Sequence, residues 1–434
     1  MPSEPIQTET REESQPTPTV VRAENKKSMI IGSLCFLAYM GCHIGKNILG
    51  ALMPQILDAM PDAAATLGSM TSVFLLTYGF GQLINGVIGT FLPAKWMVFI
   101  GLAASGGIIM LFPVLGISRL GSVLWGVCGF SSSMMWGPIA AMVGENTKEK
   151  AAKTILTALT AASLLGALVT YLLAFLASRQ ESWKPFFALA GVLMLIIALV
   201  WLPVCTRMEK KGMLVSARQK RESTPGIRGE ERKKLLRVFG SIGFLSMVLA
   251  TMLNGVIRNA TSIWVPTFLS RSLGLSLSAV SLISSLLPLV CISGTFLSLY
   301  ILRFFRNNEK AECLALFLTS AICFALVLLF QHTCVPIALV ALFVAMAGMH
   351  GACNMIFSVY VLNFRPYGII SGMSGFLDFA SYMSASAASM LFTSLSAKDN
   401  WYGVVLCWAL CCAAGVVFSL TAQIPSRQEK AEKR

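Results

Sequence analysis

Two basic residues lie deep inside long apolar segments of the sequence, one in each half of the chain. Lys46-Asn47 and Arg258-Asn259 are both followed by a proline eight residues after the cation. A charge at membrane depth is costly, and by default it marks a substrate or ion pathway. Guanidinium and ammonium groups both bind phosphate and carboxylate, the guanidinium in a two-pronged geometry. The pair therefore predicts a central binding site for an anion.

The alternative for both cations is a structural role. A long basic side chain can extend toward the membrane surface while its aliphatic stem stays in lipid, or it can pair with a carboxylate. Arg258 lies about 30 Å from the start of its segment at 1.5 Å per residue, which makes the surface difficult to reach. We favour a site role for Arg258, and less strongly for Lys46.

Other polar residues share these apolar segments and are candidate substrate ligands. His43 precedes Lys46 by three residues and lies on nearly the same helical face. A buried histidine whose hydrogen bonds are satisfied within the protein is an equally good interpretation of His43 and of His350. The further candidates in these segments are Asn47, Tyr39 and Asn254.

Asp378 is the acidic residue inside the membrane segments of the second half. It can pair with Arg258, neutralise that charge when no ligand is bound, or carry a coupling proton. A structural partner and a proton carrier are both open interpretations.

The sequence contains no recognisable catalytic constellation. There is no GxSxG elbow, no phosphate-binding P-loop and no metal-binding motif. Most of the 12 cysteines lie inside apolar segments, and none forms a CxxC pair, so they are expected to act as small hydrophobic residues. We therefore predict a protein that is not an enzyme and that binds neither cofactor nor metal.

The elements that must position these residues are membrane-spanning helices. Apolar residues make up 56% of the chain and charged residues 12%, and the mean hydropathy is +0.72. Runs of more than about 18 apolar residues are typical of transmembrane helices, and the alternating pattern of a membrane β-barrel is missing. The predicted fold class is an all-α membrane protein with twelve helices, at about 29–56, 66–92, 96–117, 120–143, 153–178, 184–204, 238–269, 277–302, 312–331, 335–362, 368–395 and 400–423.

The distribution of basic residues predicts the orientation in the membrane. Of the 34 lysines and arginines, 27 fall on the side of the two termini and five on the opposite side. By the positive-inside rule both termini are cytoplasmic, and we expect a bacterial inner or plasma membrane location. The net charge of +14 then reflects topology and contact with lipid headgroups rather than nucleic acid.

The chain divides around one long basic segment. We predict a disordered cytoplasmic tail at 1–28, a six-helix half at 29–204, a basic linker at 205–237, a second six-helix half at 238–423 and a cytoplasmic tail at 424–434. Two pseudo-symmetric parallel halves of this kind are the pattern of major facilitator transporters.

Several stretches resemble one group of these transporters, the organophosphate:phosphate antiporter family, which includes glycerol-3-phosphate and hexose-phosphate transporters. The resemblance extends over nearly all of the membrane domain. Its motifs are GKN (45–47), LGSMTSVFLLTYGFGQLINGVIG (67–89), GFSSSMMWGP (129–138), IRNATSIWVPTFL (257–269), SGTFL (293–297) and SGMSGFLDFASY (371–382).

The resemblance implies a phosphate site built from one arginine in the first helix and one in the seventh. Arg258 matches the second of these, and Tyr382 matches the tyrosine of the eleventh helix. Gly45 stands where the family has the first arginine, and Ser163 where glycerol-3-phosphate transporters have a histidine. An anion site remains the prediction, without a commitment to phosphate esters over carboxylates.

The turns that usually carry acidic gate residues also depart from the superfamily pattern. Thr90 stands at the expected aspartate after the second helix, and Arg303 at the expected acid after the eighth. Neither of the usual cytoplasmic ionic locks can form, so we expect other contacts to close the inner gate.

These observations predict a secondary transporter of a small organic anion that works by rocker-switch alternating access and acts as a monomer. The resemblance implies exchange for inorganic phosphate, while the residues leave proton symport open. A membrane ligand sensor of the same fold is the alternative from another class. An exporter of cationic compounds is disfavoured, because it would need central carboxylates rather than central cations.

Overall fold

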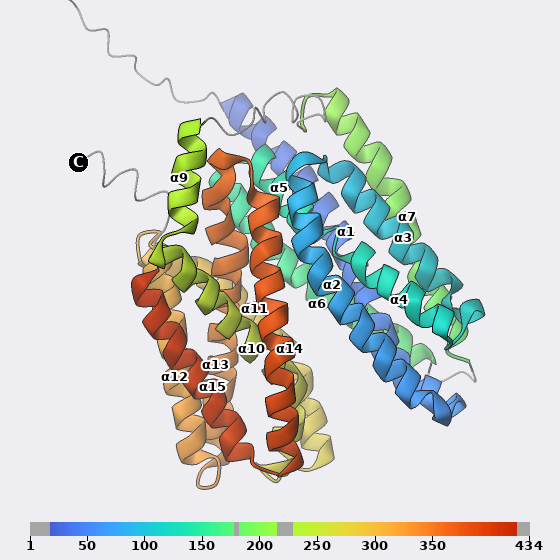
Figure 1. Cartoon of the computed structure of the whole chain (residues 1–434), viewed down its shortest axis with the longest axis vertical. Coiled ribbons are helices and arrows are strands. Elements are labelled where there is room, and N and C mark those ends of the chain that lie inside the picture. The colour runs from blue at the N-terminus through green and yellow to red at the C-terminus, as the bar shows by residue number, and fades with distance from the viewer. Residues whose placement is uncertain (1–17, 178–181, 215–228, 423–434) are drawn as a thin grey trace, which may run out of the picture.

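The computed structural model describes residues 18–177, 182–214 and 229–422. Throughout these residues the regular structure is helical (Figure 1). The first half contains α1 (Pro18–Ala59), the short 3₁₀ helix η1 (Pro61–Ala63), α2 (Ala64–Phe91), α3 (Ala94–Leu115), α4 (Arg119–Ser132), α5 (Trp136–Asn146), α6 (Glu149–Ala177) and α7 (Lys184–Lys210). The second half contains α9 (Gly229–Phe239), α10 (Ile242–Arg271), α11 (Leu277–Phe304), α12 (Glu309–Phe330), α13 (Val335–Asn354), the π-helix η2 (Met355–Val359), the 3₁₀ helix η3 (Tyr360–Tyr367), α14 (Ile370–Ala397) and α15 (Trp401–Thr421).

Corresponding helices pack in the same way in the two halves. In the first half α1 packs on α6, α2 on α4 and α3 on α7; in the second half α10 packs on α14, α11 on α13 and α12 on α15. Each half also has a tryptophan-centred core: Trp125 contacts Phe74 and Phe112, and Trp408 contacts Phe268 and Phe324. The predicted architecture of two six-helix bundles is confirmed.

Ten helical segments in the described part of the chain are long and apolar enough to cross a membrane. The fourth span is divided into α4 and α5, with 14 and 11 residues, each too short to cross alone. The eleventh span, α14, has 28 residues but contains Asp378 and many serines and glycines. With these two added, the architecture has the twelve spans that hydropathy predicts, and the chain is a multi-pass membrane protein.

The fourth span of each half departs from the single helix that we predicted. The segment expected at 120–143 is interrupted between Ser132 and Trp136, where the Ser133 hydroxyl donates to the Phe130 carbonyl at 2.6 Å. Such a side-chain hydrogen bond competes with the helical backbone ladder. The segment expected at 335–362 changes from α-helix to π-helix at Met355 and then to a 3₁₀ helix.

Several predicted boundaries also shift, because helices continue beyond the apolar segment. Residues 18–28, which we assigned to a disordered tail, form the first turns of α1, and Glu24 forms an ion pair with Lys148. Within the predicted linker at 205–237, α7 continues to Lys210 and α9 occupies Gly229–Phe239. Alanine, glutamate and lysine are strong helix formers, so a helix can continue into polar sequence beyond its apolar segment. Residues 1–17, 215–228 and 423–434 of the predicted tails and linker lie outside the described residues.

The halves approach each other at one end of the molecule, which we call the linker face. It is the end where α7 finishes at Lys210 and α9 begins at Gly229. The main contacts between halves are made by α2 and α5 with α14 and by α6 with α11, and α5 with η3 and α6 with η2 add smaller ones. In Figure 1 the helices of the two halves lie close at this end and diverge toward the opposite end.

Small residues make the contact between α2 and α14 very close. We call this contact the glycine interlock; it comprises Gly86, Gly89, Ser371 and Gly375. A Cβ atom added to Gly375 would lie 2.2 Å from the Gln82 carbonyl oxygen, and one added to Gly86 would lie 2.8 Å from the Gly375 Cα. No larger side chain fits at this crossing without moving backbone, so the interlock depends on glycine.

Candidate functional site

Lys46 lies in the middle of α1 and reaches across to the second half of the molecule. Its Nζ donates a hydrogen bond to the Tyr382 hydroxyl at 2.6 Å. The same nitrogen lies 4.2 Å from the ring centroid of Tyr78 and 4.8 Å from that of Tyr382. The two tyrosine rings meet edge to face at 5.3 Å. Lys46 is therefore held by aromatic faces and one hydroxyl, an arrangement that stabilises a cation in a dry environment.

Arg258 occupies the equivalent position in α10 and faces the same region. It interacts electrostatically with Asp378, Tyr382 and Tyr39. Asp378 interacts with both Arg258 and Lys46, and so does His43. The structure thus brings the two predicted cations, which are far apart in the sequence, to one central cluster comprising Lys46, Arg258, Asp378, Tyr382, Tyr39, His43 and Tyr78.

Asp378 is the acidic member of the central cluster and is 8% exposed. It projects from α14 within electrostatic reach of both cations. A carboxylate beside two cations lowers the cost of burying them, because each buried charge then has an opposite charge nearby. With one carboxylate and two cations, the cluster keeps a net positive charge that suits an anion.

Aromatic and imidazole groups from the first half form a wall beside the cations. The Tyr39 ring lies 4.8 Å from His43 and 5.1 Å from Trp136, measured between ring centroids. Among the described residues, the Nε2 atoms of His43 and of His350 are buried and form no hydrogen bond. His350, on α13, interacts electrostatically with Arg258. One imidazole from each half is therefore available to bind a polar ligand.

The side-chain amide nitrogens of the two predicted asparagines donate to backbone carbonyls. The Asn254 side chain is fully buried, and its amide donates to the Met349 carbonyl at 2.8 Å, which joins α10 to α13. The Asn47 amide donates to the His43 carbonyl of its own helix at 2.7 Å. Among the described residues the Asn254 Oδ1 is buried and forms no hydrogen bond, so this residue keeps a free acceptor.

Sequence reasoning missed Tyr78 and Trp136, which contact the predicted residues directly. Tyr78 lies in the apolar stretch LLTYGFGQ, where the argument that selected Tyr39 applies equally. Trp136 begins α5, directly after the break in the fourth span, and is 6% exposed. No local signal distinguishes it from an ordinary core tryptophan.

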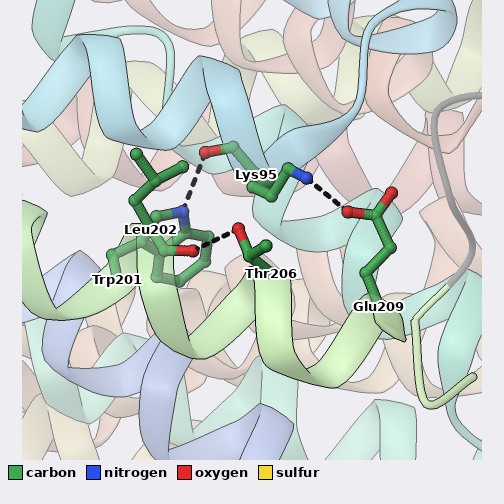
Figure 2. Close-up of polar contacts among 5 residues, drawn as sticks. All are labelled: Lys95, Trp201, Leu202, Thr206 and Glu209. Carbon is green, nitrogen blue, oxygen red and sulfur yellow. Dashed lines mark hydrogen bonds and ion pairs between the residues drawn. The ribbon is translucent and has the colours of Figure 1, made fainter. Parts of the chain in front are cut away.

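The turn after α2 is anchored within its own half instead of across the gate (Figure 2). Lys95 forms an ion pair with Glu209 of α7, and the Trp201 indole donates to the Lys95 carbonyl at 2.9 Å. Thr90, in place of the usual acid, lies at the start of α14: a Cβ added to Gly372 would be 3.1 Å from its hydroxyl. Closure at this point rests on the glycine interlock.

Comparison with known proteins places the chain in a family. The family model described as Major Facilitator Superfamily matches residues 35–389. The match covers most of the chain, which therefore belongs to the Major Facilitator Superfamily.

The membrane sensor protein UhpC of Escherichia coli (strain K12) is 24% identical over 257 residues, covering 56% of this chain and 57% of UhpC. The chain thus spans little more than half the length of this relative in the match. The proton:xylose symporter XylE superposes with a TM-score of 0.70 at 13% identity, over 93% of this chain and 98% of XylE. FucP in the outward conformation superposes with a TM-score of 0.69 at 14% identity, over 92% and 100% of the two chains.

These comparisons bear directly on the sequence predictions. The superfamily and the structural neighbours are transporters, not enzymes, as predicted. The similarity to UhpC is consistent with the resemblance to the organophosphate antiporter family. The structural likeness supports the fold.

Proposed function

We propose that this membrane protein transports a small organic anion, a phosphate ester or a carboxylate, by rocker-switch alternating access. The observation that carries the proposal is the meeting of Lys46 and Arg258, one from each half, at the central cluster beside Asp378. A guanidinium and an ammonium on opposite halves can hold one anion between them.

The Tyr382 hydroxyl would compete with the anion for the Lys46 ammonium group. The hydrogen bond between Lys46 and Tyr382 joins α1 in the first half to α14 in the second. An anion that takes the ammonium group would release Tyr382 and draw Lys46 toward Arg258. A ligand shifts the conformational equilibrium only as far as it binds one state better than another. Contact with both cations in an occluded state supplies that difference.

The charge of the cluster bears on the coupling mechanism. With Asp378 ionised, the cluster carries one net positive charge, which a monovalent anion would neutralise. Exchange of the organic anion for inorganic phosphate, as the family resemblance implies, keeps Asp378 ionised throughout. Proton symport is the alternative, in which Asp378 takes up a proton as the anion binds.

A ligand sensor without transport activity is the second candidate function. It is favoured by the sequence similarity to the membrane sensor UhpC. A sensor would bind the same anion at the same residues but would not move it across the membrane. Binding without uptake is therefore the outcome that selects this function.

The positions of the basic residues support the proposed orientation. Lys148, Arg303, Arg306 and Arg365 lie on the linker face together with the start of α1. We propose that this face is cytoplasmic, in a bacterial inner or plasma membrane, and that a monomer is the functional unit.

Uptake into proteoliposomes tests the proposal. Purified protein is reconstituted with or without internal phosphate and offered a panel of sugar phosphates, glycerol phosphate and carboxylates. We expect one anion class to accumulate, and we expect Arg258→Ala and Lys46→Ala to lose at least about tenfold of the rate, since each removes a charge-assisted contact.

Matched controls exist on the same two helices. Arg271→Gln removes an exposed arginine at the end of α10, and Lys26→Gln removes an exposed lysine near the start of α1. Both should transport like the wild type. Unchanged uptake in Arg258→Ala and Lys46→Ala would refute the central anion site. Uptake driven by a pH gradient without internal phosphate would replace exchange with proton symport.

A further inference from the structure

Two adjoining cavities lie between the halves at the linker face, away from the central cluster. The first has a volume of about 490 Å³. It lies between the start of α6 on one side and, on the other, the turn between α11 and α12 together with η3. The second has a volume of about 460 Å³ and lies between α6 and the end of α11. Both are lined by Glu149, Lys153 and Asn307, so they form one continuous hollow surface.

Five cations from both halves line this surface. The first half contributes Lys150 and Lys153; the second half contributes Arg303, Arg306 and Arg365. In the part of the chain that the structure describes, no ion pair involves Lys150, Arg306 or Arg365. Like charges that face one another across a concave surface repel unless an anion lies between them.

The surface carries two carboxylates against its five cations. Glu149 pairs with Lys153 at 2.7 Å within α6. Glu309 accepts a hydrogen bond from the Asn363 amide at 2.7 Å. Beneath this surface, the buried Glu312 interacts electrostatically with Lys153. Lys153 is thus paired within its own half, whereas none of the ion pairs among the described residues involves Lys150 or the three arginines.

The backbone that carries Arg306 is strained. Arg306 and Asn307 both adopt positive φ, at 53° and 57°, in the turn between α11 and α12. Two successive left-handed residues that are not glycine are energetically unfavourable and tend to persist at functional sites. The turn places Arg306 on the first cavity and Asn307 on both.

The positive-inside rule alone does not account for this arrangement. It places basic residues on the cytoplasmic side but does not require them to face one another between the halves. Lys210 and Lys211, at the end of α7, are linker-face cations outside both cavities. The positive-inside rule alone explains the position of these two lysines, so they supply matched controls.

We propose that this linker-face surface binds a phosphate-bearing anion, which bridges the two halves and stabilises the conformation with a closed linker face. Arginine recognises phosphate in a two-pronged geometry. Arg306 and Arg365 line the first cavity with Lys153 of the other half, and Arg303 lines the second with Lys150 and Lys153. Since the surface exists only while the halves are together, a ligand there opposes their separation. The phosphate group belongs either to a free solute or to an anionic lipid headgroup.

Pyrophosphate is the probe for a free solute. The full chain is placed in phosphatidylcholine nanodiscs and titrated by calorimetry, and hydrogen exchange is followed at the start of α14. We expect pyrophosphate to slow exchange at Ser371–Gly375. The double variant Arg303→Gln/Arg306→Gln should bind at least about tenfold more weakly, since two charge-assisted contacts are lost, and Lys210→Gln/Lys211→Gln should bind like the wild type.

Arg258→Gln separates this surface from the central cluster, because it should lower pyrophosphate binding only at the centre. In a second arm, phosphatidylglycerol replaces part of the phosphatidylcholine. Slower exchange in that arm alone, lost in the double variant, identifies a lipid headgroup as the source. The proposal is overturned if neither phosphate source slows exchange, if the double variant behaves like its control, or if Arg258→Gln alone abolishes all binding.

Discussion

The two halves meet on α14 in two chemically different ways. Near the linker face, Gly375 packs directly against the backbone of Gln82 and Gly86 of α2, and the Ser371 side chain fills the space beside Gly89. Farther along the same helix, Asp378 and Tyr382 meet Lys46 of the opposite half through charge and a hydrogen bond. One contact depends on shape and the other on charge.

The difference separates two tasks within one helix. A shape contact is indifferent to solutes, because nothing small enough can replace a glycine-to-backbone contact. A charge contact can be replaced by an anion, because the anion offers Lys46 a stronger partner than a neutral hydroxyl. We infer that the glycine interlock sets how firmly the linker face closes, while the central cluster makes opening depend on the ligand.

The largest expected effect comes from breaking the shape contact. In Gly375→Ala, the new Cβ would lie 2.2 Å from the Gln82 carbonyl oxygen and 2.7 Å from the Gly86 Cα. These are backbone atoms, so overpacking should destabilise the closed linker face by about 1–3 kcal/mol. We expect hydrogen exchange in residues 82–90 to be about 5- to 150-fold faster, and uptake to be slower.

Gly107→Ala is the matched control for this substitution, because no atom lies within 4 Å of a Cβ at that position. It should leave both exchange and uptake unchanged. If Gly375→Ala exchanges like the wild type, closure depends on charge and the comparison fails.

A smaller effect should follow from removing the neutral partner of Lys46. Tyr382→Phe keeps both ring contacts but deletes the hydroxyl that accepts from Lys46 at 2.6 Å. A hydrogen bond to a charged group contributes about 1.5 kcal/mol at the lower end of its range, so freeing Lys46 should tighten binding of the transported anion by about tenfold. Calorimetric titration with the anion found in the uptake panel measures it.

Tyr402→Phe, at an exposed tyrosine of α15, is the control and should bind normally. Weaker binding in Tyr382→Phe would show that the hydroxyl contacts the anion itself. The tyrosine would then be a ligand of the anion rather than its competitor.

The smallest effect is expected at the ion pair that lies within one half. Lys95 and Glu209 move together in any rocking motion, because α3 and α7 belong to the same bundle (Figure 2). A double-mutant cycle with Lys95→Gln and Glu209→Gln should give a coupling energy of about 1 kcal/mol in unfolding experiments. Uptake should stay at the wild-type rate. A large loss of uptake in both single variants would show that this pair acts in gating after all.

Features of the fold that depend on local apolar content could be predicted from the sequence, and features that depend on other interactions could not. Membrane insertion is decided by the local apolar content of about 20 residues, so the spans could be recognised one by one. The start of α1 at Pro18 and the division of the fourth span could not, because they depend on polar helix formers in water and on the hydrogen bond from Ser133. Hydropathy measures neither.

The candidate site was predicted in part for a similar reason. Lys46, Arg258 and Asp378 stand out because a charge in an apolar segment is anomalous wherever its partner lies. Asn254 stood out on the same ground, but its amide braces α10 against α13. Tyr78 and Trp136 were missed because aromatic residues are ordinary in membrane helices, and their proximity to Lys46 and Tyr39 arises only on packing.

By itself the sequence determined the number and type of the spans, the division into two halves and the presence of two deeply placed cations. Those features follow from transfer free energies that each segment carries locally. Only the tertiary structure decided that both cations act on the same aspartate, that Tyr382 accepts a hydrogen bond from Lys46 and that glycines of α2 and α14 meet at the linker face. These are contacts between residues hundreds of positions apart, and packing geometry, not local composition, selects them.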